Sequence, residues 1–244
     1  MEHRSLEELE AGLDHVRQSP TSVGTLELIV RRPVVEEREV LEEAELDLSV
    51  GLVGDCWLTR GSSSTEDGSA DADAQLTVMN SRSVALVAGS VDRWQLAGDQ
   101  LFVDLDLSVG QLPAGSRVAI GDAIIEITAK PHRGCDKFAA RFGKVALRFV
   151  NTGEGLVLNL RGAQRTGRDT RHDPPRRHGA SQYTFGSKRS TSLLRPQRIA
   201  KSTGAATSQD CQRPQRAHSH TVAIEPSSSA CSQNTTNTQP EGSP

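Results

Sequence analysis

The stretch Gln100-Leu101-Phe102-Val103-Asp104-Leu105-Asp106-Leu107 decides the fold class of this chain. Every second position is apolar, as in a strand with one buried face: Leu101, Val103, Leu105 and Leu107. Asp104 and Asp106 then point to the opposite, solvated face. The stretch therefore predicts a strand over 100–107 that contributes one row of side chains to a hydrophobic core.

Further short elements are predicted on both sides of this strand. Ser5-Leu6-Glu7-Glu8 fits a capping box, in which the serine hydroxyl and the glutamate carboxylate each satisfy a free amide. It begins a helix over 6–16, and the other predicted helices are 81–88, 136–142 and 144–150, the last two separated by Gly143. The other predicted strands are 24–30, 75–79, 116–120, 123–128 and 156–160. No strand–long helix–strand unit recurs, so we expect a mainly β protein with short helices, built as a barrel.

The charge distribution divides the chain at Gly162. Residues 1–162 hold 26 acidic and 16 basic residues, whereas residues 163–244 hold 5 acidic and 12 basic ones. The second part has only six Leu, Ile, Val or Phe residues, too few to offset the entropy of ordering its backbone. We therefore expect an N-terminal helix in 1–20, a β-barrel domain in 21–162 and a disordered basic tail in 163–244.

Several classes of protein are excluded by composition. No run of 18 apolar residues is present, and the N-terminus has no apolar signal region, so a cytoplasmic location without membrane insertion is expected. The four cysteines show no CxxC spacing, which argues against a zinc site or a disulfide framework. The basic tail lacks interleaved aromatic residues, which argues against nucleic acid as a partner.

The segment 128–143 carries the candidate chemistry. It places Cys135 where a loop meets a predicted helix, so free backbone amides and the helix dipole favour its thiolate. Asp136 is the only acid of the segment, against five potential cations: Lys130, His132, Arg133, Lys137 and Arg141. A thiolate in such surroundings can act as a nucleophile, a carrier of persulfide sulfur or a soft metal ligand.

Each of these residues also has a plainer interpretation. Cys135 could be a small buried hydrophobic residue, as most cysteines without a function are. His132 is either an ordinary loop residue or the base of a Cys-His pair, since a spacing of three lets both face one pocket. Gly134 would let a bulky ligand approach the backbone. Cys56 has no cationic neighbours in sequence and is expected to be structural.

Five segments together resemble a MOSC domain, the module named after the C-terminal part of molybdenum cofactor sulfurases. The resemblance covers residues 23–162 and rests on their order along the chain. The segments are Gly24-Thr25-Leu26-Glu27-Leu28-Ile29-Val30-Arg31-Arg32-Pro33, Gly51-Leu52-Val53-Gly54-Asp55, Gln75-Leu76-Thr77-Val78-Met79-Asn80, Ala97-Gly98-Asp99-Gln100 and the Cys135 segment.

This resemblance implies a fold similar to the pyruvate kinase β-barrel domain and a role for Cys135. It matches the cysteine that accepts sulfur and passes it to a metal cofactor; in related reductases the matching cysteine ligates molybdenum. The implied partners are a cysteine desulfurase as sulfur donor and a molybdenum enzyme or its cofactor as acceptor. Pyridoxal phosphate would belong to the desulfurase, because this chain has no segment that could hold its binding fold.

The resemblance also implies contacts to molybdopterin. Cations suit its phosphate: Arg82, Arg133, Lys137 and Arg141. Asn80, with Gln75 and Asp55, could hydrogen-bond the pterin edges. Each of these residues could equally be a turn residue or a solvated charge.

The family continues beyond the position of Gly162 with strands that close the barrel, whereas here a polar sequence follows. We therefore hypothesise a shifted reading frame or an aberrant exon, with a missing closing strand and an unpaired sheet edge. Three functions remain open: a cofactor-binding sulfur carrier, a molybdenum-dependent reductase-like enzyme, and a non-catalytic barrel that only binds.

Overall fold

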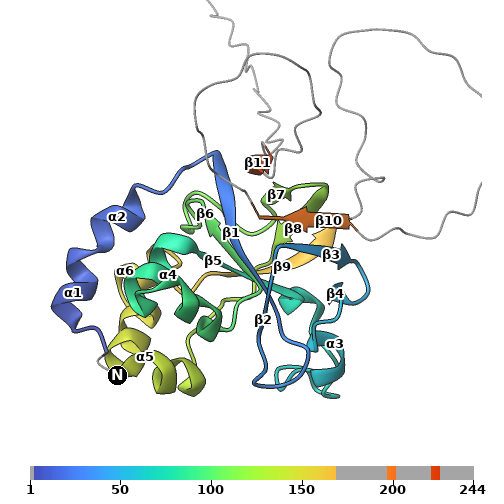
Figure 1. Ribbon diagram of the computed structural model, residues 1–244, viewed down its shortest axis with the longest axis horizontal. Helices are drawn as coiled ribbons and strands as arrows, with labels where there is room; N and C mark the ends of the chain where they lie inside the picture. Colours follow the sequence, from blue (N-terminus) through green and yellow to red (C-terminus); the bar gives the residue numbers. More distant parts are fainter. Residues whose placement is uncertain (1–2, 169–196, 202–220, 226–244) are drawn as a thin grey trace, which may run out of the picture.

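The computed structural model of the 244-residue chain describes residues 3–168, 197–201 and 221–225 (Figure 1). Its centre is a closed barrel of seven strands in the order β11-β7-β8-β9-β5-β6-β1, in which β11 also pairs with β1. Among the strands that the structure describes, β5 and β6 are the one parallel pair. The strands are β1 (Val23–Arg31), β5 (Leu76–Asn80), β6 (Leu101–Asp104), β7 (Arg117–Ile120), β8 (Ala123–Ile127), β9 (Ala163–Arg168) and β11 (Thr221–Glu225). The expected mainly β, barrel-like fold is confirmed.

Two small additions complete the β structure. β2 (Glu39–Leu41) pairs with the end of β1, and a separate three-stranded sheet has the order β10-β3-β4. Its strands are β3 (Glu43–Asp47), β4 (Gly51–Leu52) and β10 (Gln197–Ala200). Ala44, Leu46 and Ile199 of this sheet join the apolar cluster inside the barrel. The small sheet therefore packs on the barrel core.

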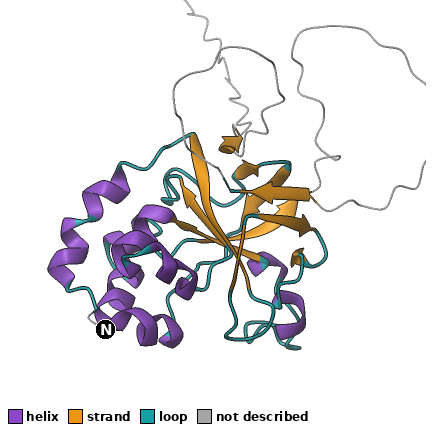
Figure 2. Cartoon of the chain, viewed as in Figure 1, coloured by secondary structure: helices purple, strands orange, loops and turns teal. Residues whose placement is uncertain are grey.

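Most of the helices gather on one side of the barrel (Figure 2). Around this side lie α1 (Leu6–Ala11), α2 (Leu13–Arg17), α4 (Ser81–Ala88), α5 (Asp136–Asn151), α6 (Glu154–Val157) and the 3₁₀ helix η2 (Val91–Ala97), whereas α3 (Trp57–Arg60) and η1 (Ala72–Ala74) lie elsewhere. Strand β1 serves both sides because successive side chains of a strand point to opposite faces, so Ile29 joins the barrel core and Val30 joins a second core beneath the helices. A bulge between Leu26 and Leu28 shifts this alternation, so Leu26 lies in the barrel core and Leu28 in the second core. Within the described residues, no helix is long and apolar enough to cross a membrane.

The N-terminal helical segment begins where the sequence predicts, but it is interrupted in its middle. The capping box is present, with Ser5 N–H donating to Glu8 Oε2 at 2.8 Å and Glu8 N–H donating to Ser5 Oγ at 3.2 Å. The helix is interrupted at Gly12, where a Cβ atom would lie 2.3 Å from Leu86 Cδ1. Close packing against α4 therefore divides the expected helix 6–16 into α1 and α2.

The strand predicted at 156–160 is wrong. Gly153 takes a φ of +50° and starts a turn, and Leu158 N–H donates to Glu154 O at 2.9 Å. These local bonds make the short helix α6 instead of a strand. The strand predicted at 100–107 is shorter in the structure, although Leu105 and Leu107 are buried as expected.

The domain boundary expected at Gly162 is also wrong. β9 lies between β8 and β5, and β11 lies between β7 and β1, so both form part of the closed wall. Strand pairing joins backbone amides and carbonyls, so a polar segment can close a barrel whose other strands supply the apolar side chains. The closing strands are therefore not missing. The remainder of the expected disordered tail, 169–196, 202–220 and 226–244, lies outside the described residues.

Candidate functional site

Cys135 is an exposed, free thiol at the N-cap of α5. The residue before it is fixed by Asn151, which accepts from Gly134 N–H at 2.8 Å and donates to Gly134 O at 3.0 Å. A Cβ atom on Gly134 would lie 2.7 Å from Leu147 Cδ1, so the space beside this glycine belongs to α5 itself rather than to a ligand. The interpretation of Cys135 as a buried hydrophobic residue is wrong, and its sulfur is open to reagents.

The first half of α5 carries two cations that share one carboxylate. α5 is broken at Gly143 as predicted, with a φ of +92°. Before this break, Lys137 Nζ lies 2.5 Å from Glu36 Oε1, and Arg141 Nη2 lies 2.6 Å from Glu36 Oε2. The hydrogen bond from Lys137 is the largest cause of a lowered pKa of Glu36. Glu36 comes from the β1–β2 connection, so this connection is tied to α5.

Three arginines from distant parts of the chain converge on residues 96–99, which form the end of η2 and the turn after it and are called the loop 96–99. Arg141 Nη1 donates to Leu96 O at 2.8 Å, and Arg161 Nη2 donates to Ala97 O at 2.9 Å. Arg32 Nη1 donates to Gly98 O at 3.1 Å. These carbonyls end a helix and have no partner within it, so each can accept a guanidinium.

Gly98 is the point around which this loop turns. Its φ of +90° lies in the left-handed region that favours glycine. A Cβ atom there would lie 3.8 Å from Arg38 Nη2 and 3.9 Å from Arg141 Nη1. We call Arg32, Arg38 and Arg141 the arginine cluster.

Asp99, the last residue of this loop, is fully buried. Arg161 Nη1 lies 2.5 Å from its Oδ2 atom, and His132 Nδ1 lies 3.4 Å from its Oδ1 atom without forming a hydrogen bond. Burial raises the pKa of Asp99 against the attraction of Arg161. Burial and the neighbouring arginines hold the pKa of His132 well below its ordinary value. His132 is therefore neutral near pH 7 and faces the interior.

The arginine cluster has more cations than carboxylates. Arg32 forms a two-pronged pair with buried Asp55, from Nε to Oδ2 at 2.9 Å and from Nη2 to Oδ1 at 2.8 Å. Among the described residues no carboxylate lies within ion-pair distance of Arg38, and its Nε atom has no hydrogen-bond partner. Burial, then repulsion from Arg141 and Arg32, lowers the pKa of Arg38. Within the described residues, the four cations of the cluster and Lys137 form ion pairs with two carboxylates, Asp55 and Glu36, an excess of positive charge that favours an anionic ligand.

Unpartnered polar atoms mark the interior next to the cluster. Buried polar groups in proteins nearly always have a hydrogen-bond partner. In the described part of the chain, five such atoms near Asp99 lack one: Asp99 Oδ1, Gln100 Nε2, His132 Nδ1, Arg161 Nε and Gln164 Oε1. This interior therefore suits a bound polar group.

The predicted cations of the Cys135 segment do not all surround the thiol. Lys130 pairs with Asp71, Lys137 and Arg141 pair with Glu36, and Arg133 is exposed in the loop before Cys135. No hydrogen bond joins the Cys135 sulfur to His132 within the residues that the structure describes. The structure therefore does not assemble a Cys-His pair, and acids distant in sequence take up much of the local positive charge.

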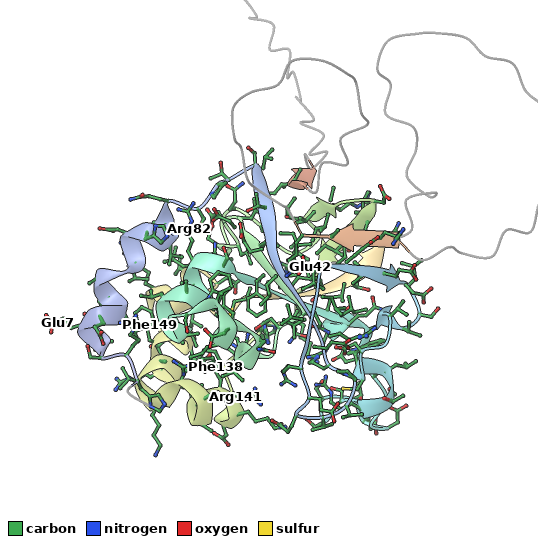
Figure 3. All side chains as sticks on the ribbon, viewed as in Figure 1. Glu7, Glu42, Arg82, Phe138, Arg141 and Phe149 are labelled. Atoms are coloured by element: carbon green, nitrogen blue, oxygen red, sulfur yellow. The ribbon has the colours of Figure 1, made fainter. Side chains whose placement is uncertain are left out.

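Two predicted ligand-binding residues have structural partners instead. Asn80 caps α4, accepting from Arg82 N–H and Ser83 N–H and donating to Ser19 Oγ and Leu105 O. Arg82 pairs with Asp104 at 2.7 and 3.0 Å. Figure 3 shows Arg82 on the far side of the helical layer from Arg141. The structure thus brings Lys137 and Arg141 together at Glu36, in the first half of the helix that Cys135 caps, and leaves Arg82 apart.

The other two residues proposed for the pterin also have partners. Gln75 donates from Nε2 to Leu48 O at 2.8 Å and accepts at Oε1 from Gly167 N–H at 2.9 Å. Asp55 is held by Arg32. Cys56 is buried as expected, and its N–H donates to Arg32 O at 2.7 Å.

Sequence reasoning does not predict Arg38, Asp99 or Arg161 as site residues. Gly98-Asp99 has the composition of a turn, and Arg161 stands at the expected end of the domain. Asp99 follows a glycine directly before a buried strand, which is the one local signal that could have pointed to it. Their meeting depends on tertiary structure.

A cleft of about 570 Å³ lies elsewhere, between the N-terminal segment, α4 and the end of the first half of α5. Phe142 lines it and Cys135 does not, so we do not assign the thiol chemistry to it. Among the residues that the structure places, no group of three or more His, Cys, Asp or Glu side chains could hold a metal ion.

Comparisons with known proteins give likenesses of fold. No family model matches this chain, and no curated protein matches it. Among solved structures, the chain is similar to the YUAD protein from Bacillus subtilis, with 12% identity and a TM-score of 0.47 over 73% of this chain and 92% of that one. It is also similar to YiiM from Escherichia coli, with 13% identity and a TM-score of 0.43 over 84% and 72% of the two chains.

Proposed function

We propose that this protein is a MOSC-type sulfur carrier that binds an anionic, molybdopterin-type cofactor and receives sulfur as a persulfide on Cys135. The observation that carries the proposal is an exposed thiol at the start of α5, two residues before Lys137 and six before Arg141. Arg141 in turn donates a hydrogen bond to the loop 96–99. An accessible sulfur and an anion-attracting surface thus share one short helical segment.

The residues present fit such a cofactor in two ways. Arg38, Arg141 and Lys137 could hold a phosphate, since Arg38 has no carboxylate of its own in the described structure. The unpartnered atoms around Asp99 could meet the polar edges of a pterin. When bound, the cofactor supplies a metal centre that accepts sulfur, and the thiolate of Cys135 is a suitable soft ligand for it.

The sulfur transfer needs no oxidant. The Cys135 thiolate attacks the outer sulfur of a persulfide on the donor enzyme. A new sulfur–sulfur bond forms at Cys135, the donor's sulfur–sulfur bond breaks, and the donor cysteine leaves as a thiolate. In this proposal the donor is a separate pyridoxal-phosphate-dependent cysteine desulfurase, and the acceptor is a molybdenum enzyme or its cofactor in the reducing cytosol. His132, which is neutral and faces away, takes no proton in this step.

Transfer is tested by incubating the full chain with a purified cysteine desulfurase and L-cysteine. Peptide mass spectrometry should find one added sulfur atom on Cys135. The added mass should disappear in Cys135→Ser and persist in Cys56→Ala, because Cys56 is buried. Absence of persulfide on Cys135 in the wild-type chain would overturn the proposal.

The same exposed thiol also allows a second function, ligation of molybdenum in a reductase-like protein. Elemental analysis of protein purified from a host that makes the cofactor distinguishes this function. Molybdenum that is present in the wild type and absent in Cys135→Ser, without persulfide transfer, would favour ligation. If neither activity is found, the barrel is a binding module only.

A further inference from the structure

Glu36 has an unusual backbone and an unusual position. It lies between β1 and β2 with a φ of +72°, in the left-handed region that residues with a Cβ atom seldom adopt. Its turn is closed by a bond from Glu37 N–H to Val34 O at 3.2 Å. Val34 and Val35 beside it are more than half exposed. The tip of this connection therefore has little packing of its own, and ionic contacts hold it.

Those contacts are with Lys137 and Arg141, two cations in the first half of α5, which Cys135 caps. Glu36 bonds Lys137 and Arg141 through different carboxylate oxygens, although its side chain remains 55% exposed. Behind it, Arg38 Nη1 donates to Glu37 O at 2.6 Å, and Arg38 Nε has no partner. The carboxylate of Glu36 thus covers part of a surface where three cations meet.

We propose that Glu36 is an internal competitor, which occupies the subsite for a tetrahedral oxyanion such as phosphate and must be displaced when that ligand binds. The inference rests on the proposed function, because it concerns the same cationic site. A phosphate offers oxygens in several directions, so it can meet the Lys137 ammonium and two guanidinium groups at once. The Glu36 carboxylate meets only Lys137 and Arg141.

The ion pairs that phosphate would displace cost little free energy to break. Exposed pairs between long side chains contribute little, since water and salt screen them. Release of Glu36 also lets its backbone leave the left-handed conformation, which is unfavourable for a residue with a Cβ atom. The competitor should therefore weaken phosphate binding without preventing it, and it should exclude monovalent anions more effectively than phosphate.

The test is titration of inorganic phosphate into the full chain by calorimetry. Glu36→Gln should bind phosphate about five-fold more tightly than the wild type, because two weak exposed ion pairs no longer compete. Glu36→Gly should gain at least as much, since glycine tolerates the same φ. Glu37→Gln is the matched control and should bind as the wild type does, because its exposed side chain lies outside the site.

Adding Arg141→Gln to Glu36→Gln should remove the gain. Equal or weaker binding in Glu36→Gln, or no phosphate binding in any variant, would overturn the inference. Persulfide formation on Cys135 is measured in the same variants. Persulfide without a phosphate effect would defeat the competitor alone, and a phosphate effect without persulfide would defeat sulfur carriage alone.

Discussion

Two arginines only four residues apart show how differently two regions of this barrel treat a buried charge. We call the Asp99–Arg161 pair and the end of η2 beside it the mouth, and the barrel core around Arg165 the interior. Arg161, at the mouth, bonds Asp99 and Ala97 O, and its guanidinium lies 5.1 Å from the centre of the Phe138 ring. Arg165, in β9, pairs across the sheet with Leu76 and Ile127 of the barrel core. Both arginines are nearly inaccessible to solvent.

Their surroundings differ in the partners available. Arg165 Nη1 donates to Gln164 O at 2.9 Å, but its Nε and Nη2 atoms have no partner in the described structure. Burial lowers the pKa of Arg165 to about 9. The mouth thus holds its buried charge within a network of partners, whereas the interior carries a charge that destabilises the wall.

The largest effect is expected when the network at the mouth is broken. Arg161→Met leaves Asp99 buried without its cation, which should cost about 3–5 kcal/mol of unfolding free energy in urea denaturation. Adding Asp99→Asn should recover part of the loss, because the unpaired charge is then gone. A loss below about 1 kcal/mol would contradict the proposed network.

The interior should respond in the opposite direction. Arg165→Leu removes an unpaired buried charge, so it should raise the unfolding free energy by about 1–3 kcal/mol. The control is Arg60→Leu, which changes an exposed arginine at the end of α3 and should have little effect. A loss of stability in Arg165→Leu would mean that Arg165 has a partner, and the contrast between the two regions would fail.

Sequence alone predicts the parts of this molecule that follow from local patterns. The alternation around Leu101, the capping box at Ser5 and the break at Gly143 are all confirmed, because neighbouring residues determine them. The position of Cys135 at a helix start is confirmed in the same way, whereas the sequence left open whether its side chain is exposed or buried.

The parts that depend on tertiary contact are those that sequence misses. β9 contains Gln164, Arg165 and Gly167, which have no strand pattern. It forms a strand because its backbone hydrogen-bonds to the edges of β5 and β8. Asp99 and Arg161 are far apart in sequence, so their buried pair cannot be inferred from local composition.

A smaller effect concerns the pH dependence of the mouth. The pKa of His132 in the folded chain is well below its unfolded value of about 6.5. As pH falls through about 6.5, the unfolded state binds this proton first, so stability declines, by at most about 1.4 kcal/mol per pH unit. Urea denaturation of the wild type and His132→Gln between about pH 5 and 7.5 should show a smaller decline in the variant. Equal slopes would mean that His132 is not held neutral by burial.

The central claim is that the Cys135 thiol and the arginine cluster form one site. The most direct measurement is the rate at which iodoacetate and iodoacetamide alkylate Cys135 in the full chain, followed by peptide mass spectrometry. If the claim holds, the ratio of the iodoacetate rate to the iodoacetamide rate is higher for Cys135 than for free cysteine. This increase becomes smaller with added salt and in the double variant Arg38→Gln/Arg141→Gln. A rate ratio equal to that of free cysteine, unchanged by salt or by the variant, would contradict it.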